Sequence, residues 1–154
     1  MSDVVEDAGR GVALLIRDRV LAVHPLVAVD ILEAEDGGFT QLVFTPANPN
    51  GVSVWVYVNY DNSVQVNAGS MVAEDLEYSA TLAERIEVSL RLVLSLATNG
   101  YSKVRAFWFL GPLSPSHVGP TSGFWGLDDY IGRPMSEIVE SLEPWEGTGA
   151  SDSA

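Results

Sequence analysis

The side chains best suited to acid–base or nucleophilic chemistry lie in one glycine- and proline-rich stretch, residues 111–133. The run Ser-Pro-Ser-His at 114–117 places two hydroxyls near the imidazole of His117. Asp128 or Asp129 would have to orient that ring, as the acid of a Ser-His-Asp triad does. No Gly-x-Ser-x-Gly elbow follows a predicted strand, so a polar surface loop is the simpler interpretation and we assign no catalytic residue. A ligand pocket under this loop stays open as an alternative, lined by His117, Trp125, Asp128 and Asp129.

Clustered carboxylates offer a second kind of chemistry, the binding of hard cations such as calcium through oxygen ligands. The clusters are Glu33 with Glu35, the acids of 74–77, and Asp128 with Asp129. None has the Asp-x-Asp-x-Asp-Gly spacing of a calcium loop. The glycines at 119–126 do not open a helix directly after a strand, as a phosphate-binding loop requires. We therefore expect neither a metal nor a cofactor.

The distribution of charge indicates the kind of partner. The chain has 8 Lys and Arg against 21 Asp and Glu, a formal net charge of −13. Proteins that bind nucleic acid backbones gain affinity from clustered cations, so we expect no nucleic acid partner. Unneutralised like charge favours a cationic partner or serves solubility. Residues 20–84 contain no Lys or Arg, and their acids are Asp30, Glu33, Glu35, Asp36, Asp61, Glu74, Asp75, Glu77 and Glu84.

Composition also excludes whole classes of site. The chain has no Cys, which rules out disulfides, thiolate zinc sites and a cysteine nucleophile. No apolar window approaches the roughly 20 residues of a membrane span. The acidic first residues lack the basic segment of a secretory leader. We therefore expect a cytoplasmic protein with no membrane partner, and the scarcity of Lys beside abundant Ala, Val and Gly is typical of a high-GC bacterial genome.

Periodicity predicts the elements that position these residues. Apolar side chains at spacings of three and four predict a helix over 7–23, ended by His24-Pro25. Alternation then predicts a four-strand antiparallel meander, with strands at 26–32, 39–44 and 52–59 and a returning strand from Val64. In the third strand Val54, Val56 and Val58 share one face.

The second half of the chain returns to a helical period over 82–97, and Asn99-Gly100 ends that helix. The apolar run 104–110 predicts a fifth strand inside the sheet, covered on both faces. The long loop 111–133 follows, and then a short acidic helix over 134–142 between two prolines. Together these elements predict a single two-layer α+β domain over 1–145 and a flexible acidic tail over 146–154.

Trp55 and Tyr57 alternate with the valines, so they occupy the opposite face of their strand. A sheet with one helical layer buries only one face. Two outcomes are open: the aromatics form the centre of an interface surrounded by acids, or Phe124, Trp125 and Tyr130 fold over them as a second small core.

Three segments resemble small acidic bacterial α+β binding proteins of the toxin-immunity or secretion-chaperone type. They are the alternating run 52–58, the returning segment 64–69, and the long helix that ends at Asn99-Gly100 before a strand. The resemblance implies a non-catalytic protein of the inhibitor type that docks a basic protein, and a toxin is one example of such a partner. The expected contacts are Asp30, Glu33, Glu35, Asp36, Trp55, Tyr57, Glu74, Asp75 and Glu77.

Two other functions stay open. One is a small-ligand-binding protein or hydrolase-like enzyme with its pocket under the loop 111–133. The other is a structural module that pairs with a second copy, so the chain is expected to be a monomer or a homodimer.

Overall fold

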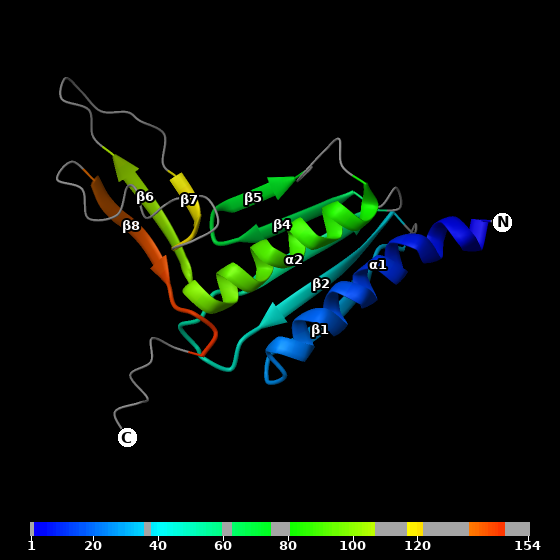
Figure 1. Cartoon of the computed structure of the whole chain (residues 1–154), viewed down its shortest axis with the longest axis horizontal. Coiled ribbons are helices and arrows are strands. Elements are labelled where there is room, and N and C mark those ends of the chain that lie inside the picture. The colour runs from blue at the N-terminus through cyan, green and yellow to red at the C-terminus, as the bar shows by residue number, and fades with distance from the viewer. Residues whose placement is uncertain are drawn as a thin grey trace.

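The computed structural model of this chain describes residues 2–35, 38–59, 63–74, 81–106, 117–121 and 136–146. Within these residues it has two helices and two antiparallel sheets, one of five strands and one of three (Figure 1). The predicted α+β class with an antiparallel meander is therefore confirmed. None of the helices in these parts of the chain is long and apolar enough to cross a membrane.

The larger sheet is a meander in which each strand pairs with the next along the chain. The sheet extends the predicted meander by one strand, because the Gly69-Ser70 turn sends the chain back as β5 along β4. Its strands are β1 (Ala28–Glu33), β2 (Phe39–Thr45), β3 (Val54–Asn59), β4 (Val64–Ala68) and β5 (Met71–Glu74).

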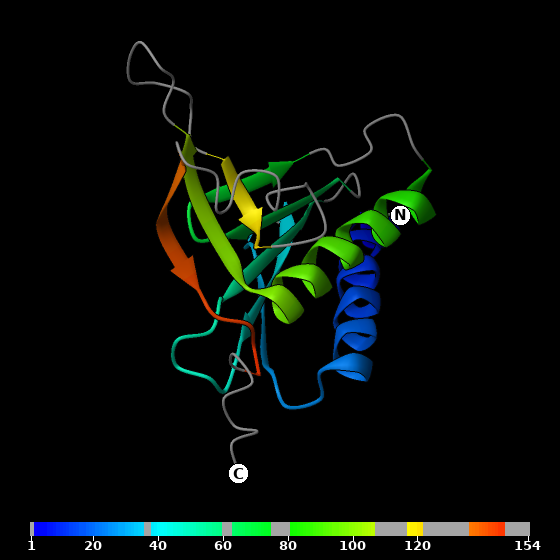
Figure 2. The same ribbon diagram turned by 60° about the vertical axis from the view of Figure 1, so that its left-hand side comes forward.

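Two helices, α1 (Ser2–Val23) and α2 (Leu82–Asn99), lie against the same face of this sheet (Figure 2). The start of α2 is capped by Thr81, whose side-chain oxygen accepts a hydrogen bond from the backbone N–H of Glu84 at 3.2 Å. Such a cap satisfies one of the otherwise unpaired amides of the first turn. The helix ends at Gly100, which has a φ of 80° that suits glycine.

The core lies between the helices and the valine face of the sheet. Val54, Val56 and Val58 are fully buried, as their alternation predicts. Burial of each such side chain contributes roughly 1.5–3 kcal/mol. The helical side chains in the same cluster are Val12, Ala13, Ile16 and Val20 of α1 and Ile86, Leu90, Leu92, Val93, Leu96 and Ala97 of α2.

The three-stranded sheet has the order β7-β6-β8 and consists of β6 (Tyr101–Ala106), β7 (His117–Pro120) and β8 (Ser136–Leu142). The predicted strand at 104–110 corresponds to β6, shifted toward the N-terminus, and residues 107–110 lie outside the described residues. β6 is the central strand of its sheet, but that sheet is the second one and not the meander.

The short helix predicted over 134–142 is wrong, because Ser136–Leu142 forms the edge strand β8 against β6. Seven residues are too few for a helix to be stable without tertiary packing. The β-branched pair Ile138 and Val139 suits a strand, and pairing with β6 satisfies the backbone of this segment.

Tyr101 connects the two sheets. Gly69 turns between β4 and β5 with a φ of 55°, and a Cβ at this position would lie 2.5 Å from the Tyr101 ring. The neighbouring Ser70 N–H donates a hydrogen bond to the Tyr101 hydroxyl at 2.9 Å. The absence of a side chain at Gly69 thus lets the turn pack directly on the buried ring.

Candidate functional site

The face of the larger sheet that turns away from the helices is the first candidate site. We call it the outer sheet face. Its residues follow from the strand registers, because directly paired residues point to the same side of a sheet. They include Asp30 and Leu32 of β1, Gln41 and Val43 of β2, Trp55 and Tyr57 of β3, Gln65 and Asn67 of β4, and Val72 of β5.

Apolar side chains on the outer sheet face keep contact with solvent. Leu32 and Val72, on the two edge strands, are 53% and 58% exposed. Trp55 and Tyr57 lie between them on the central strand, and both are half-buried. The predicted placement of the two aromatics opposite the valines is therefore confirmed. Phe124, Trp125 and Tyr130, which were expected as their cover in one outcome, lie outside the described residues.

Tyr57 is held in position by two neighbours on β2. Its hydroxyl accepts a hydrogen bond from the Gln41 side-chain amide at 3.0 Å. The ring of Phe39 meets the Tyr57 ring edge to face, with centroids 5.5 Å apart and an interplanar angle of 66°. An aromatic side chain fixed in this way loses little further freedom when a partner binds.

The acids that the sequence groups together are divided by the sheet. Asp30 is exposed on the outer sheet face and pairs in register with Val43, next to Trp55. Glu33 occupies the other face, where it forms an ion pair with Arg10 of α1. Glu35 is exposed in the turn after β1.

The remaining predicted contacts are only partly described. Glu74 is the last residue of β5, in register with Gln65. Asp36, Asp75 and Glu77 lie outside the described residues, as do Trp125, Asp128 and Asp129 of the alternative pocket. His117 is the first residue of β7 and pairs with Val104.

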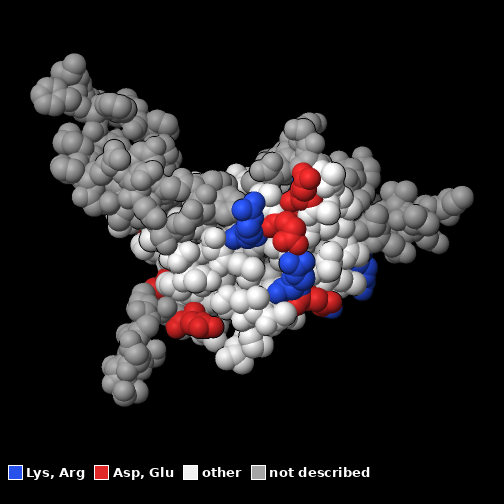
Figure 3. Space-filling model, in the orientation of Figure 1, with Lys and Arg blue, Asp and Glu red and all other residues white. Residues whose placement is uncertain are grey.

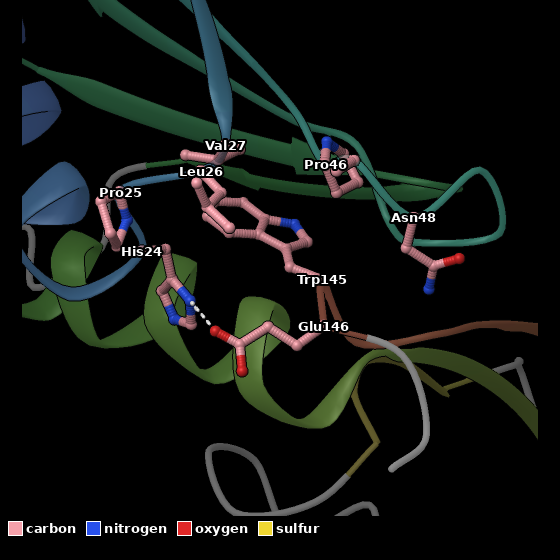
Figure 4. Close-up of a pocket in the computed structure, with 9 residues that line it drawn as sticks. His24, Pro25, Leu26, Val27, Pro46, Asn48, Trp145 and Glu146 are labelled. Atoms are coloured by element: carbon pink, nitrogen blue, oxygen red, sulfur yellow. Dashed lines mark ion pairs between the residues drawn. The ribbon is translucent and has the colours of Figure 1, made fainter. Parts of the chain in front are cut away.

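A second candidate site is a cleft of about 480 Å³ at one end of the sheet (Figure 4). We call it the His24–Trp145 cleft. Three separate segments contribute to it: the connection from α1 to β1, the connection from β2 to β3, and the residues after β8. The lining residues are His24, Pro25, Leu26, Val27, Pro46, Ala47, Asn48, Trp145 and Glu146.

Trp145 forms the floor of this cleft and is 4% exposed. Its indole N–H donates a hydrogen bond to the Val52 carbonyl at 2.7 Å, and its ring packs on Phe44 with centroids 5.8 Å apart. The His24 ring meets it edge to face at 5.2 Å. Sequence reasoning missed this site because its residues come from three connections that no single motif contains.

At the mouth of the cleft, His24 Nδ1 lies 3.5 Å from the Glu146 carboxylate (Figure 4). The Glu146 side chain is 81% exposed, whereas that of His24 is 11% exposed. The other ring nitrogen, Nε2, is buried and has no hydrogen-bond partner among the described residues.

The helical layer differs from both sites because three of its arginines, Arg10, Arg17 and Arg19, contact carboxylates. Figure 3 views the molecule from the helical side and shows basic and acidic side chains next to one another. On α1, Arg17 contacts Asp18 at 2.8 Å, and Arg19 reaches Glu87 of α2 at 3.1 Å. The sheet strands β1 to β5, in contrast, contain no Lys or Arg.

The fold and these surfaces define an acidic α+β protein with a helix-covered antiparallel meander and an outer sheet face that mixes apolar and polar side chains. Among the residues described, no group of three or more His, Asp or Glu side chains could hold a metal ion. Comparisons with protein-family models, with curated proteins and with solved structures find no match for this chain. Its function is therefore argued from its own residues.

Proposed function

We propose that this chain is a non-catalytic protein-binding module of the inhibitor type, and that its outer sheet face docks a basic protein. The observation that carries the proposal is the separation of charge between the two layers. Strands β1 to β5 contain acids but no Lys or Arg, and Asp30 lies on the outer sheet face, whereas the arginines of α1 and α2 belong to the helix-covered side, where Arg10 pairs with Glu33.

Charge complementarity supports a cationic partner. Asp30 and Glu35 are exposed in and after the edge strand β1, and no cation of the sheet neutralises them. A surface of one sign accelerates association with a partner of the opposite sign and rejects partners of the same sign.

Apolar contact supplies the affinity that exposed charges do not. Trp55 and Tyr57 are half-buried at the centre of the face, and Leu32 and Val72 are exposed at its edges. Interfaces concentrate binding energy in such central aromatic side chains, with polar groups around them. We expect Trp55→Ala to weaken partner binding by about 2 kcal/mol or more.

The test begins with affinity capture from the native host, identification of a basic partner by mass spectrometry, and titration of that purified partner by calorimetry. Binding should weaken steeply when salt rises from about 50 mM to about 500 mM, because exposed charges are screened. Asp30→Asn should weaken binding further at low salt. The matched control is Asp18→Asn on α1, which removes the same charge from an exposed side chain of the helical layer.

The proposal requires the two variants to differ. Equal losses for Asp30→Asn and Asp18→Asn would mean that only net charge matters, and that the outer sheet face is not the contact surface. A partner that binds with no salt dependence, or that binds Trp55→Ala as tightly as the natural chain, would also contradict it.

A further inference from the structure

The His24–Trp145 cleft has properties that the docking of a protein on the outer sheet face does not use. We propose that it binds a small organic cation, an aromatic or branched aliphatic amine whose apolar body fills the cleft and whose ammonium group contacts the Glu146 carboxylate. The proposal rests on the size of the cleft, its rigid apolar walls and the charge at its mouth.

The size and lining suit a small molecule. The volume of about 480 Å³ lies within the roughly 300–1,000 Å³ of ligand sites, which are mostly apolar with a few polar groups that fix orientation. Here the apolar walls are Pro25, Leu26, Val27, Pro46, Ala47 and Trp145. Leu26 is 84% exposed, so a ligand in the cleft would remove apolar surface from water.

The walls are fixed before any ligand arrives. The backbone N–H of His24 donates to the Val20 carbonyl at 2.8 Å, which extends the hydrogen bonding of α1 to the cleft. At the floor of the cleft, the Trp145 backbone N–H donates to the Ala97 carbonyl at 2.8 Å, and its indole N–H donates to the Val52 carbonyl. Binding to a formed site does not require the protein to order itself, which favours affinity for small ligands.

The charge at the mouth selects a cation. Among the described residues that line the cleft, Glu146 carries the negative charge and none is Lys or Arg. A second carboxylate, that of Glu143, is held beside the cleft by the Asn48 side-chain amide at 3.1 Å. An anionic ligand would be repelled by the Glu146 carboxylate, whereas an ammonium group would be attracted to it.

The experiment titrates the protein with 2-phenylethylamine and follows the Trp145 indole N–H resonance by NMR. Two probes with closely similar apolar bodies serve as comparisons, neutral 2-phenylethanol and anionic 3-phenylpropionate. We expect saturable binding in the order amine, alcohol, carboxylate. Glu146→Gln should weaken amine binding about two- to fivefold, as expected for an exposed ion pair, and bring the amine close to the alcohol.

Two further variants separate this site from the outer sheet face. Ala47→Trp places a large side chain in the cleft and should abolish binding of both the amine and the alcohol. Asp30→Asn, which is expected to weaken binding of the basic protein partner, should leave amine binding unchanged.

Three results would overturn the proposal. These are the absence of saturable amine binding, carboxylate binding as tight as amine binding, and an unchanged amine affinity in Glu146→Gln. If the basic protein partner perturbs the Trp145 resonance while the amine does not, the cleft is a protein contact and the small-cation site is rejected.

Discussion

The helical layer and the outer sheet face differ in how they treat charge. On the helical side, Arg10 contacts the carboxylate of Glu33 and Arg19 contacts that of Glu87. On the outer sheet face, strands β1 to β5 offer Asp30 no Lys or Arg, and the apolar side chains of Leu32 and Val72 are exposed. The first arrangement is self-neutralising, as expected of a surface that meets only water. The second leaves charge and apolar area available for a partner.

The largest expected effect tests whether side chains on the two faces of the sheet contribute differently to the free energy of unfolding. Leu42→Ala removes a fully buried side chain on the helix-covered face and should cost about 2–5 kcal/mol in the free energy of unfolding. Its neighbour Val43 lies half-buried on the outer sheet face, so Val43→Ala should cost about 1 kcal/mol or less. Denaturant unfolding measures both. Similar losses would mean that the outer sheet face is a second core.

The next effect concerns partner binding and uses two leucines of similar exposure. Leu32 on the outer sheet face is 53% exposed, and Leu15 on α1 is 44% exposed. Leu32→Lys should lower affinity for the basic partner by about tenfold, because it introduces a like charge into the interface. Leu15→Lys adds the same charge to the helical layer and should change affinity little. Calorimetric titration at low salt compares them, and a larger loss for Leu15→Lys would move the binding surface to the helices.

A smaller effect concerns the pH dependence of stability at the junction of the two sheets, where the Tyr101 hydroxyl is buried. Burial raises the pKa of Tyr101, and Glu140 raises it further, while the hydrogen bonds with Ser70 lower it. The folded protein thus holds the phenol proton more tightly than the unfolded chain, whose tyrosine pKa is about 10. This contribution to stability is complete below pH 10 and is lost as the pH rises above 10 through the higher pKa of the folded state.

Tyr101→Phe checks that assignment. At neutral pH it should cost about 0.5–1.5 kcal/mol through loss of the bond from the Ser70 N–H. Above pH 10 the free energy of unfolding of the natural chain should fall as Tyr101 ionises. Tyr101→Phe should lack this contribution to the fall. Tyr57→Phe, which keeps Tyr101, should retain that fall, and a retained fall in Tyr101→Phe would refute the explanation.

The smallest effect concerns the ion pairs of the helical layer. Arg10 and Glu33 are each about half exposed, so solvent screens their attraction. A double-mutant cycle with Arg10→Ala and Glu33→Gln should give a coupling of about 0.2–1 kcal/mol. A much larger value would mean that charge pairing holds α1 on the sheet, where we assign that role to apolar packing.

The sequence was informative where a pattern is local. The alternation of Val54, Val56 and Val58 identifies the buried face of β3, and the same alternation places Trp55 and Tyr57 opposite. The spacing of apolar residues and the Asn99-Gly100 stop locate α2 closely. These features depend only on neighbours along the chain, which is why they could be predicted.

Features that depend on distant segments could not be predicted in this way. The segment Ser136–Leu142 becomes a strand because β6 offers a partner, although its own residues also fit a short helix. Glu33 lies close to Glu35 in the sequence, yet in the fold it forms an ion pair with Arg10 of α1. The His24–Trp145 cleft brings together residues from three connections, and only the packed fold makes them neighbours.

Trp145 also bears on how fast the chain reaches its native state. Its indole contacts the Val52 carbonyl across 93 residues of sequence, and the nearby Asn48 amide reaches Pro144 across 96. Contacts between such distant residues require closure of a long loop before they give any stability, and domains rich in them fold slowly. A shortened chain that ends before residue 145 would lack the Trp145 ring that packs on Phe44. Folding of this domain is therefore expected to be slower than that of a helical domain of similar size, which stopped-flow tryptophan fluorescence would measure.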